Sequence, residues 1–158
     1  MHFRHIALLL LTALLPLTGC QTTEMQGIQS ARVGMADAIR SEEPGNYYIG
    51  RRYYKKDYKF WGYVRKPGEP WRNAKLVMLN EQEKLAPDRE LGQLGSDNNY
   101  EYKLYGGFTG QTVYEPASNG FYPEFGLKAY ELRSVTPVNI YRTPGATDPA
   151  RRVIAQPF

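Results

Sequence analysis

The fold is indicated most clearly by residues 99–108, which read NYEYKLYGGF. Tyrosine and leucine side chains alternate there with Glu101 and Lys103. A period of two marks a strand with one buried and one solvated face. The glycine pair at 106–107 then predicts a bulge or a sharp bend within the sheet.

A second strand pattern covers residues 124–135, which read EFGLKAYELRSV. The apolar side chains from Phe125 to Ala129 share one parity, and those from Tyr130 onward have the other. A bulge or a bend in a barrel produces such a switch. The two patterns together favour a strongly coiled sheet that closes on itself.

Three shorter β-forming runs bring the predicted strands to five, at residues 58–65, 75–80 and 111–114. Thr109-Gly110 is expected to close a hairpin, turn residues stand at 66–70 and 116–120, and residues 138–141 could add a short strand. We therefore expect an all-β domain, first as a five-stranded OB-like barrel and otherwise as an open, coiled antiparallel sheet. One feature departs from the OB pattern: the long loop at 81–99 follows the second predicted strand, whereas an OB-fold often places its helix after the third.

The first twenty residues carry the features of a secretory leader. Arg4 supplies positive charge, an apolar run follows at residues 6–15, and Leu17-Thr18-Gly19-Cys20 ends the segment. Ten helical residues span about 15 Å, roughly half of a hydrocarbon core, which suits a signal peptide and not a membrane span. This order of charge, apolar run, small residues and cysteine resembles the lipobox of bacterial lipoproteins.

The resemblance implies a lipid on Cys20, cleavage of the signal peptide at residues 1–19, and acylation with chains such as palmitate. Two or more chains anchor a protein firmly, whereas one anchors it only marginally. Gln21 stands where an Asp would favour retention in the inner membrane. We therefore expect attachment to the outer membrane, facing the periplasm. The alternative is an ordinary secretory signal with a coincidental cysteine.

The remaining chain divides into three parts. Residues 20–46 are expected to form a lipid anchor and a flexible tether, 47–141 the β domain, and 142–158 a mostly irregular tail rich in proline and glycine. A short docking helix is the alternative for the tether, because several side chains fall near a helical stripe: Ile28, Ala31, Met35, Ala38 and Ile39.

Composition excludes several classes of chemistry. Cys20 is the only cysteine, and both histidines, His2 and His5, lie in the leader. A mature chain without histidine lacks a Ser-His-Asp triad, the usual zinc sites and an imidazole base. The whole chain has 20 Lys and Arg against 16 Asp and Glu, so no general affinity for polyanions follows. We expect no cofactor and no metal.

Aromatic and basic side chains are interleaved through residues 47–72, where only Asp57 and Glu69 carry negative charge. Cations can neutralise anionic groups and aromatic rings can stack on ligands. The predicted binding residues are Arg51, Arg52, Tyr53, Tyr54, Lys55, Lys56, Lys59, Trp61 and Trp71. The alternative is that the aromatic side chains are core and the basic ones are a solvated outer face.

Other motifs carry less weight. Residues 107–110 read GFTG, which has the form of a phosphate loop but is fully explained by a hairpin turn. Residues 97–99 suit an Asx-turn better than a calcium loop. No spacing selects a catalytic pair from the carboxylates Asp88, Glu90, Asp97, Glu101, Glu115 and Glu124.

The expected function is non-enzymatic. We expect a lipid-anchored envelope lipoprotein whose β domain binds an envelope protein, lipopolysaccharide or peptidoglycan, with the membrane as a partner through Cys20 and no nucleic acid. Two alternatives are an envelope enzyme that acts on glycan or lipid with carboxylates, and a structural subunit of an envelope complex.

Overall fold

The computed structural model describes the backbone of residues 19–158 and the side chains of residues 25–158. The predicted signal peptide lies outside the described residues except for Gly19, and so does the side chain of Cys20.

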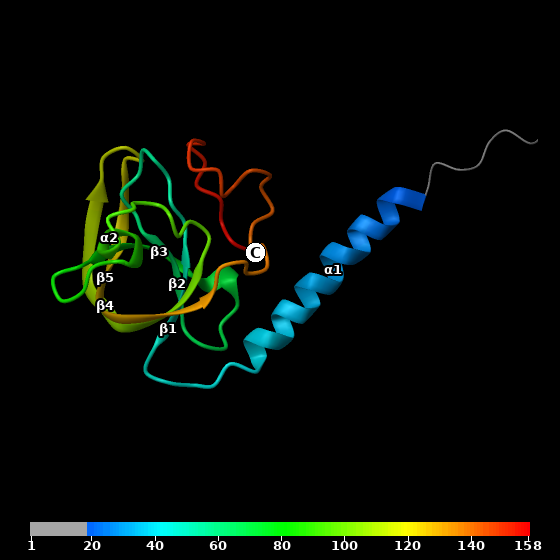
Figure 1. The fold of residues 1–158 in the computed structure, drawn as a ribbon, viewed down its shortest axis with the longest axis horizontal. Helices are drawn as coiled ribbons and strands as arrows, with labels where there is room; N and C mark the ends of the chain where they lie inside the picture. The colour runs from blue at the N-terminus through cyan, green and yellow to red at the C-terminus, as the bar shows by residue number, and fades with distance from the viewer. Residues whose placement is uncertain (1–18) are drawn as a thin grey trace, which may run out of the picture.

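Five strands close into a small barrel in the order β1-β2-β3-β5-β4 (Figure 1). The β3–β5 pair is parallel, and the four other pairs are antiparallel. This is the OB-like barrel that was the first of the two predicted architectures. The strands are β1 (Tyr48–Arg52), β2 (Gly62–Arg65), β3 (Lys75–Asn80), β4 (Glu101–Glu115) and β5 (Gly120–Ser134).

The strand boundaries correct two predictions. Strand β1, which reads YIGRR, was not predicted, and once it is counted the loop at 81–99 follows the third strand. Its short helix α2 (Pro87–Glu90) therefore stands between β3 and β4, where an OB-fold often has its helix. The hairpin predicted at Thr109-Gly110 is wrong, because both residues lie inside β4 and the chain reverses after Glu115 instead.

The predicted bend at the glycine pair is confirmed. The β4–β5 register shifts between Tyr105 and Gly106, where Lys128 is skipped on the opposite strand. Gly106 has a φ of 144°, and a Cβ there would lie 2.0 Å from the carbonyl oxygen of Gly126. Only glycine can adopt this conformation without strain. The bulge explains the change of parity in residues 124–135.

Two apolar clusters lie on opposite faces of the sheet. Alternate residues of β2 and β3 divide between them: Val64 and Val77 point into the barrel, whereas Tyr63 and Leu76 point outward. The outer cluster is buried because the irregular tail packs on it, contributing Ile140, Tyr141, Ala146 and Ala155, and because the 3-10 helix η1 (Trp71–Asn73) adds Trp71. Residues 138–141 do not form the short extra strand that the sequence suggested. They make only an isolated bridge, from Tyr141 to Pro157.

Helix α1 (Gly19–Arg40) occupies most of the segment for which we favoured a flexible tether. Figure 1 shows it projecting away from the barrel. Most of its described side chains are exposed, while Ile39 is buried and Met35 packs against the outer cluster. Of the predicted stripe, only the last turns contact the barrel. A role for this helix as a tether remains a prediction.

Candidate functional site

The structure places most of the predicted basic-aromatic surface in the interior. Six of the nine side chains are at most 4% exposed: Arg51, Arg52, Tyr53, Lys55, Trp61 and Trp71. Tyr54 is half-buried, and Lys56 and Lys59 are exposed. The expected exposed surface is therefore corrected to these three residues. The tail and helix α1 cover the face of the barrel that carries much of this segment.

Arg52 lies on the inner side of β1, where two buried carboxylates neutralise it. Its Nη2 is 2.8 Å from Asp88 Oδ2, and its Nε is 3.3 Å from Asp97 Oδ1. Tyr102 donates a hydrogen bond to Asp97 over 3.0 Å. Burial raises the pKa of Asp97, against the opposing effect of Arg52. Because Asp88 and Asp97 already neutralise its guanidinium group, Arg52 is not available to bind an external anion.

The side chains of Arg51 and Lys55 are buried on the outer face of the barrel. Arg51 Nη2 is 2.7 Å from Glu101 Oε2, and its guanidinium group lies 5.2 Å from the ring centroid of Trp71. The ammonium group of Lys55 donates to the backbone carbonyls of Ala146 and Asp148, over 2.5 and 2.7 Å. Lys55 therefore holds the tail in place, and Arg51 joins β1 to β4.

A cleft opens between the β1–β2 loop, the end of β3 and the loop that carries α2. Its volume is about 520 Å³, within the range of small-molecule sites. We call it the loop cleft. Its lining includes Arg52, Tyr54, Lys56, Tyr58, Lys59, Phe60, Trp61, Met78, Leu79, Glu81, Ala86, Asp88, Arg89 and Leu94.

Three exposed cations line the loop cleft, and they differ in how they are paired. Arg89 Nε lies 3.2 Å from Glu81 Oε2. Lys56 and Lys59 make no ion pair with any of the described residues. Two positive charges are therefore available to a ligand in the cleft.

The two carboxylates of the loop cleft are already engaged. Asp88 accepts hydrogen bonds from the backbone N–H groups of Arg89 and Gly95 in addition to its ion pair with Arg52. Glu81 accepts from the backbone N–H of Ala86 over 2.6 Å. These bonds hold both carboxylates in fixed positions and shape the loop around α2.

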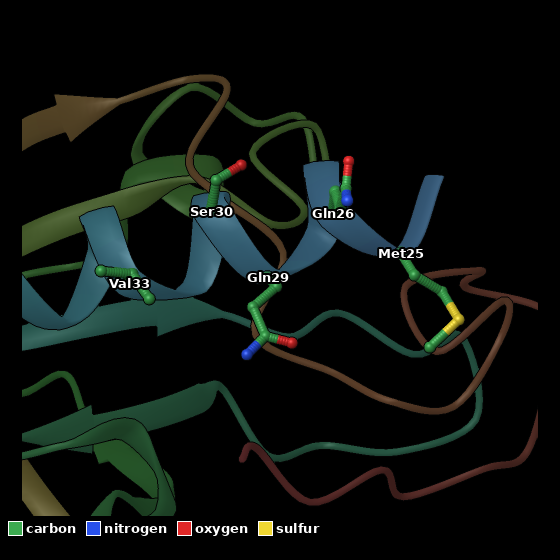
Figure 2. A pocket seen from close by; sticks show the side chains of 5 residues that line it. All are labelled: Met25, Gln26, Gln29, Ser30 and Val33. Atoms are coloured by element: carbon green, nitrogen blue, oxygen red, sulfur yellow. The ribbon is translucent and has the colours of Figure 1, made fainter. Parts of the chain in front are cut away.

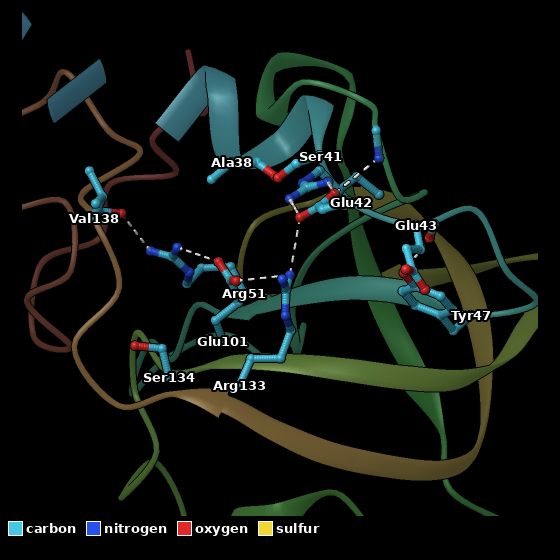
Figure 3. A network of polar contacts seen from close by, with 12 residues as sticks. Ala38, Ser41, Glu42, Glu43, Tyr47, Arg51, Glu101, Arg133, Ser134 and Val138 are labelled. Carbon is cyan, nitrogen blue, oxygen red and sulfur yellow. Dashed lines mark hydrogen bonds and ion pairs between the residues drawn. The ribbon is translucent and has the colours of Figure 1, made fainter. Parts of the chain in front are cut away.

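A second polar cluster joins helix α1 to the barrel (Figure 3). Both oxygens of Glu42 accept from Arg65, at 2.6 and 2.7 Å, and Arg133 bridges Glu42 and Glu101 at 3.1 and 3.2 Å. Burial of Glu42 opposes its ionisation, but hydrogen bonds from Arg65 and from the Gly68 backbone outweigh it and lower its pKa. The cluster holds the end of α1 in one orientation. Nothing in the sequence indicated this cluster, because Glu42 lies in the polar segment 20–46 that was predicted to be a tether.

A concave space of about 620 Å³ lies along α1 (Figure 2). All its described lining residues come from that single helix: Met25, Gln26, Gln29, Ser30 and Val33. Among the described residues it therefore has one wall, and we assign it no function.

The weaker sequence candidates have structural roles. Residues 107–110 form part of β4 and do not make a loop. Glu115 is buried and accepts backbone hydrogen bonds from Ala117 and Ser118, which shapes the β4–β5 turn. Across the described part of the chain, no group of three or more His, Cys, Asp or Glu side chains is placed to hold a metal. Neither described helix combines the length and the apolar character needed to cross a membrane.

The geometry therefore leaves the loop cleft as the candidate site, with Lys56, Lys59 and Tyr54 as the predicted residues that reach it from the surface. Comparison with known proteins finds no matching family model, curated protein or solved structure.

Proposed function

We propose that this chain is a lipid-anchored lipoprotein of the cell envelope that binds another envelope component in the loop cleft. The proposal attaches Cys20 to the outer membrane, places the barrel in the periplasm, and assigns the barrel a binding role without catalysis. It rests on the resemblance of the leader to a lipobox and on the form of the cleft.

The observation that carries the binding role is the pairing of charges in the loop cleft. A cleft of about 520 Å³ carries two lysines that the described residues do not neutralise. Envelope polymers and lipid headgroups are rich in phosphates and carboxylates, which such cations attract. The carboxylates nearby are held in internal bonds, which supports binding in preference to acid–base chemistry.

Helix α1 supports a role for the anchor. Its 22 residues span about 33 Å, and Cys20 is its second residue. The ion pairs of Glu42 with Arg65 and Arg133 hold its other end on the barrel. A lipid on Cys20 would thus hold the barrel at a defined distance from the membrane and in one orientation.

The anchoring is tested by Cys20→Ala in the full chain, with palmitate labelling and membrane fractionation in the bacterial host. We expect wild-type protein to incorporate label and lose its leader, and the variant to remain unlabelled and uncleaved by the lipoprotein pathway. Normal processing of the variant would refute the lipoprotein assignment.

The binding is tested by co-sedimentation of the mature chain, residues 20–158 with Ala at position 20. The targets are purified sacculi and vesicles with and without lipopolysaccharide, at low and high salt. We expect binding to one target that weakens as salt rises, because exposed charges are screened over about 8–10 Å at 0.1–0.15 M salt. Absence of binding to every target would refute this role.

A further inference from the structure

We propose that the loop cleft binds an anionic amphiphile, that is, an apolar chain that carries a phosphate or a carboxylate. This inference rests on the proposed envelope-binding function and names its ligand class. It follows from three features of the cleft: four apolar lining residues, two unneutralised cations, and carboxylates that are held in internal bonds.

Four apolar side chains in the lining of the loop cleft come from three parts of the fold. Phe60 belongs to the β1–β2 loop, Met78 and Leu79 end strand β3, and Leu94 follows α2. Phe60 is buried, Met78 and Leu79 are half-buried, and Leu94 is 62% exposed. An apolar chain in contact with Met78, Leu79 and Leu94 would remove these partly exposed side chains from water, which favours binding.

Two cations line the same cleft as these apolar side chains. Lys56 and Lys59 are both exposed, and both lie on the β1–β2 loop. Asp57, the one carboxylate between them in the chain, is 2.6 Å from Arg152 Nε and is held by the tail. Both lysines are therefore available to an anionic group that binds in the cleft.

The bonding of the carboxylates argues against a neutral saccharide as the ligand. A sugar site needs side-chain acceptors and amides that are free to bond hydroxyl groups. In the loop cleft, Asp88 is bound to Arg52 and to two backbone N–H groups, and Glu81 is bound to Arg89 and Ala86. Besides the hydroxyl of Tyr54, the cleft then presents mainly apolar surface and positive charge, which together match an amphiphilic anion.

The test compares four soluble probes on the mature chain, residues 20–158 with Ala at position 20, below the micelle concentration. Dodecyl phosphate and dodecanoate carry both features, dodecyl maltoside carries only the chain, and inorganic phosphate carries only the charge. Binding is followed by ¹⁹F NMR of 5-fluorotryptophan. The chain has two tryptophans, of which Trp61 lines the cleft and Trp71 is buried outside it.

We expect the two anionic amphiphiles to shift the Trp61 resonance and to leave the Trp71 resonance in place. Dodecyl maltoside should bind at least about tenfold more weakly, which corresponds to about 1.4 kcal/mol. Each CH₂ removed from the alkyl phosphate should weaken binding by up to about fourfold. A preference for phosphate would indicate a phospholipid or a phosphorylated glycolipid as the natural source, and a preference for carboxylate would indicate a fatty acid.

The variant Lys56→Ala/Lys59→Ala should weaken dodecyl phosphate binding at least about tenfold while binding of dodecyl maltoside stays unchanged. A matched control, Lys66→Ala/Lys75→Ala, removes the same charge from two exposed lysines outside the cleft and should change binding less than twofold. Circular dichroism checks that both variants are folded.

Three results would overturn the inference: equal binding of dodecyl maltoside and dodecyl phosphate, equal loss in both double variants, or a response to soluble peptidoglycan fragments but to neither alkyl anion. The sedimentation experiment separates this failure from failure of the proposed function. Binding to sacculi with no response to alkyl anions would leave the envelope-binding role standing and refute only this ligand class.

Discussion

Two buried tyrosines of the outer cluster, Tyr63 and Tyr141, make opposite predictions for the same substitution. Tyr63 is fully buried, and its hydroxyl donates to the carbonyl oxygen of Ala155 over 2.8 Å. Tyr141 is 3% exposed, and its hydroxyl has no hydrogen-bond partner among the described residues. The ring centroids lie 6.1 Å apart, so the two sites share one environment.

The expected change in the free energy of unfolding depends on whether each hydroxyl makes a hydrogen bond. Tyr63→Phe leaves the buried carbonyl of Ala155 without this donor, which should lower the free energy of unfolding by about 1–3 kcal/mol. Tyr141→Phe removes a hydroxyl that is buried without a hydrogen-bond partner among the described residues. Its loss removes an uncompensated cost of desolvation, so the free energy of unfolding should be unchanged or rise by roughly 1 kcal/mol. Burial raises the pKa of both phenols, so neither ionises near neutral pH.

The assay is urea unfolding of the mature chain at pH 7, followed by far-ultraviolet circular dichroism. With a slope of about 2 kcal/mol per molar urea, a difference of about 2 kcal/mol separates the two midpoints by about 1 M. Equal losses in both variants would refute the reasoning. A loss above about 1 kcal/mol in Tyr141→Phe would show that its hydroxyl is bonded after all.

Three further predictions concern the sheet, the junction and the tail. Gly106→Ala should unfold the protein in circular dichroism or greatly lower its urea midpoint, because its Cβ would meet the backbone of β5, whereas Gly107→Ala, with no atom within 4 Å of its Cβ, should be tolerated. The lowered pKa of Glu42 means that its ionised form stabilises the fold above the ordinary pKa of 4.5, and that this contribution is lost as pH falls through the lower folded value. Glu42→Gln should therefore weaken the dependence of the unfolding free energy on pH below about 4.5. The same dependence in the variant and the wild type over this pH range would contradict this. Deletion of residues 143–158 removes the partners of Lys55 and Tyr63 and should give a chain without a cooperative thermal transition; a cooperative transition near the wild-type temperature would contradict it.

Strand β1 shows where local patterns stop being informative. Its sequence YIGRR has no alternation of apolar and polar residues, because both of its faces are buried. Arg52 points toward the barrel interior, where it bonds to Asp88 and Asp97. These two partners lie 36 and 45 residues further along the chain. Arg51 points to the outer face and meets Glu101. A strand of this kind is stabilised by partners that are distant in sequence, so no local period reveals it.

The basic-aromatic segment illustrates the same limit for the candidate site. Its composition is evident from residues 47–72, but exposure depends on what packs above it. Tyr53, Lys55 and Tyr63 bond to the backbone of the tail, roughly a hundred residues away. Lys56 and Lys59 stay at the surface because the tail leaves the end of the barrel open. The segment 47–72 therefore supplies seven of the fourteen residues that line the loop cleft, and the other seven come from β3 and the loop around α2.

The sequence by itself determined the all-β class, the coiling of the sheet and the position of the main bulge. These depend on near neighbours: alternation sets the faces of a strand, and Gly106 permits a backbone conformation that other residues avoid. Only the tertiary structure decided which cations are neutralised, which ring faces are covered, and that the loop cleft stays open. Burial and charge pairing depend on residues brought together from distant parts of the chain, and the closed barrel with its packed tail is what brings them together.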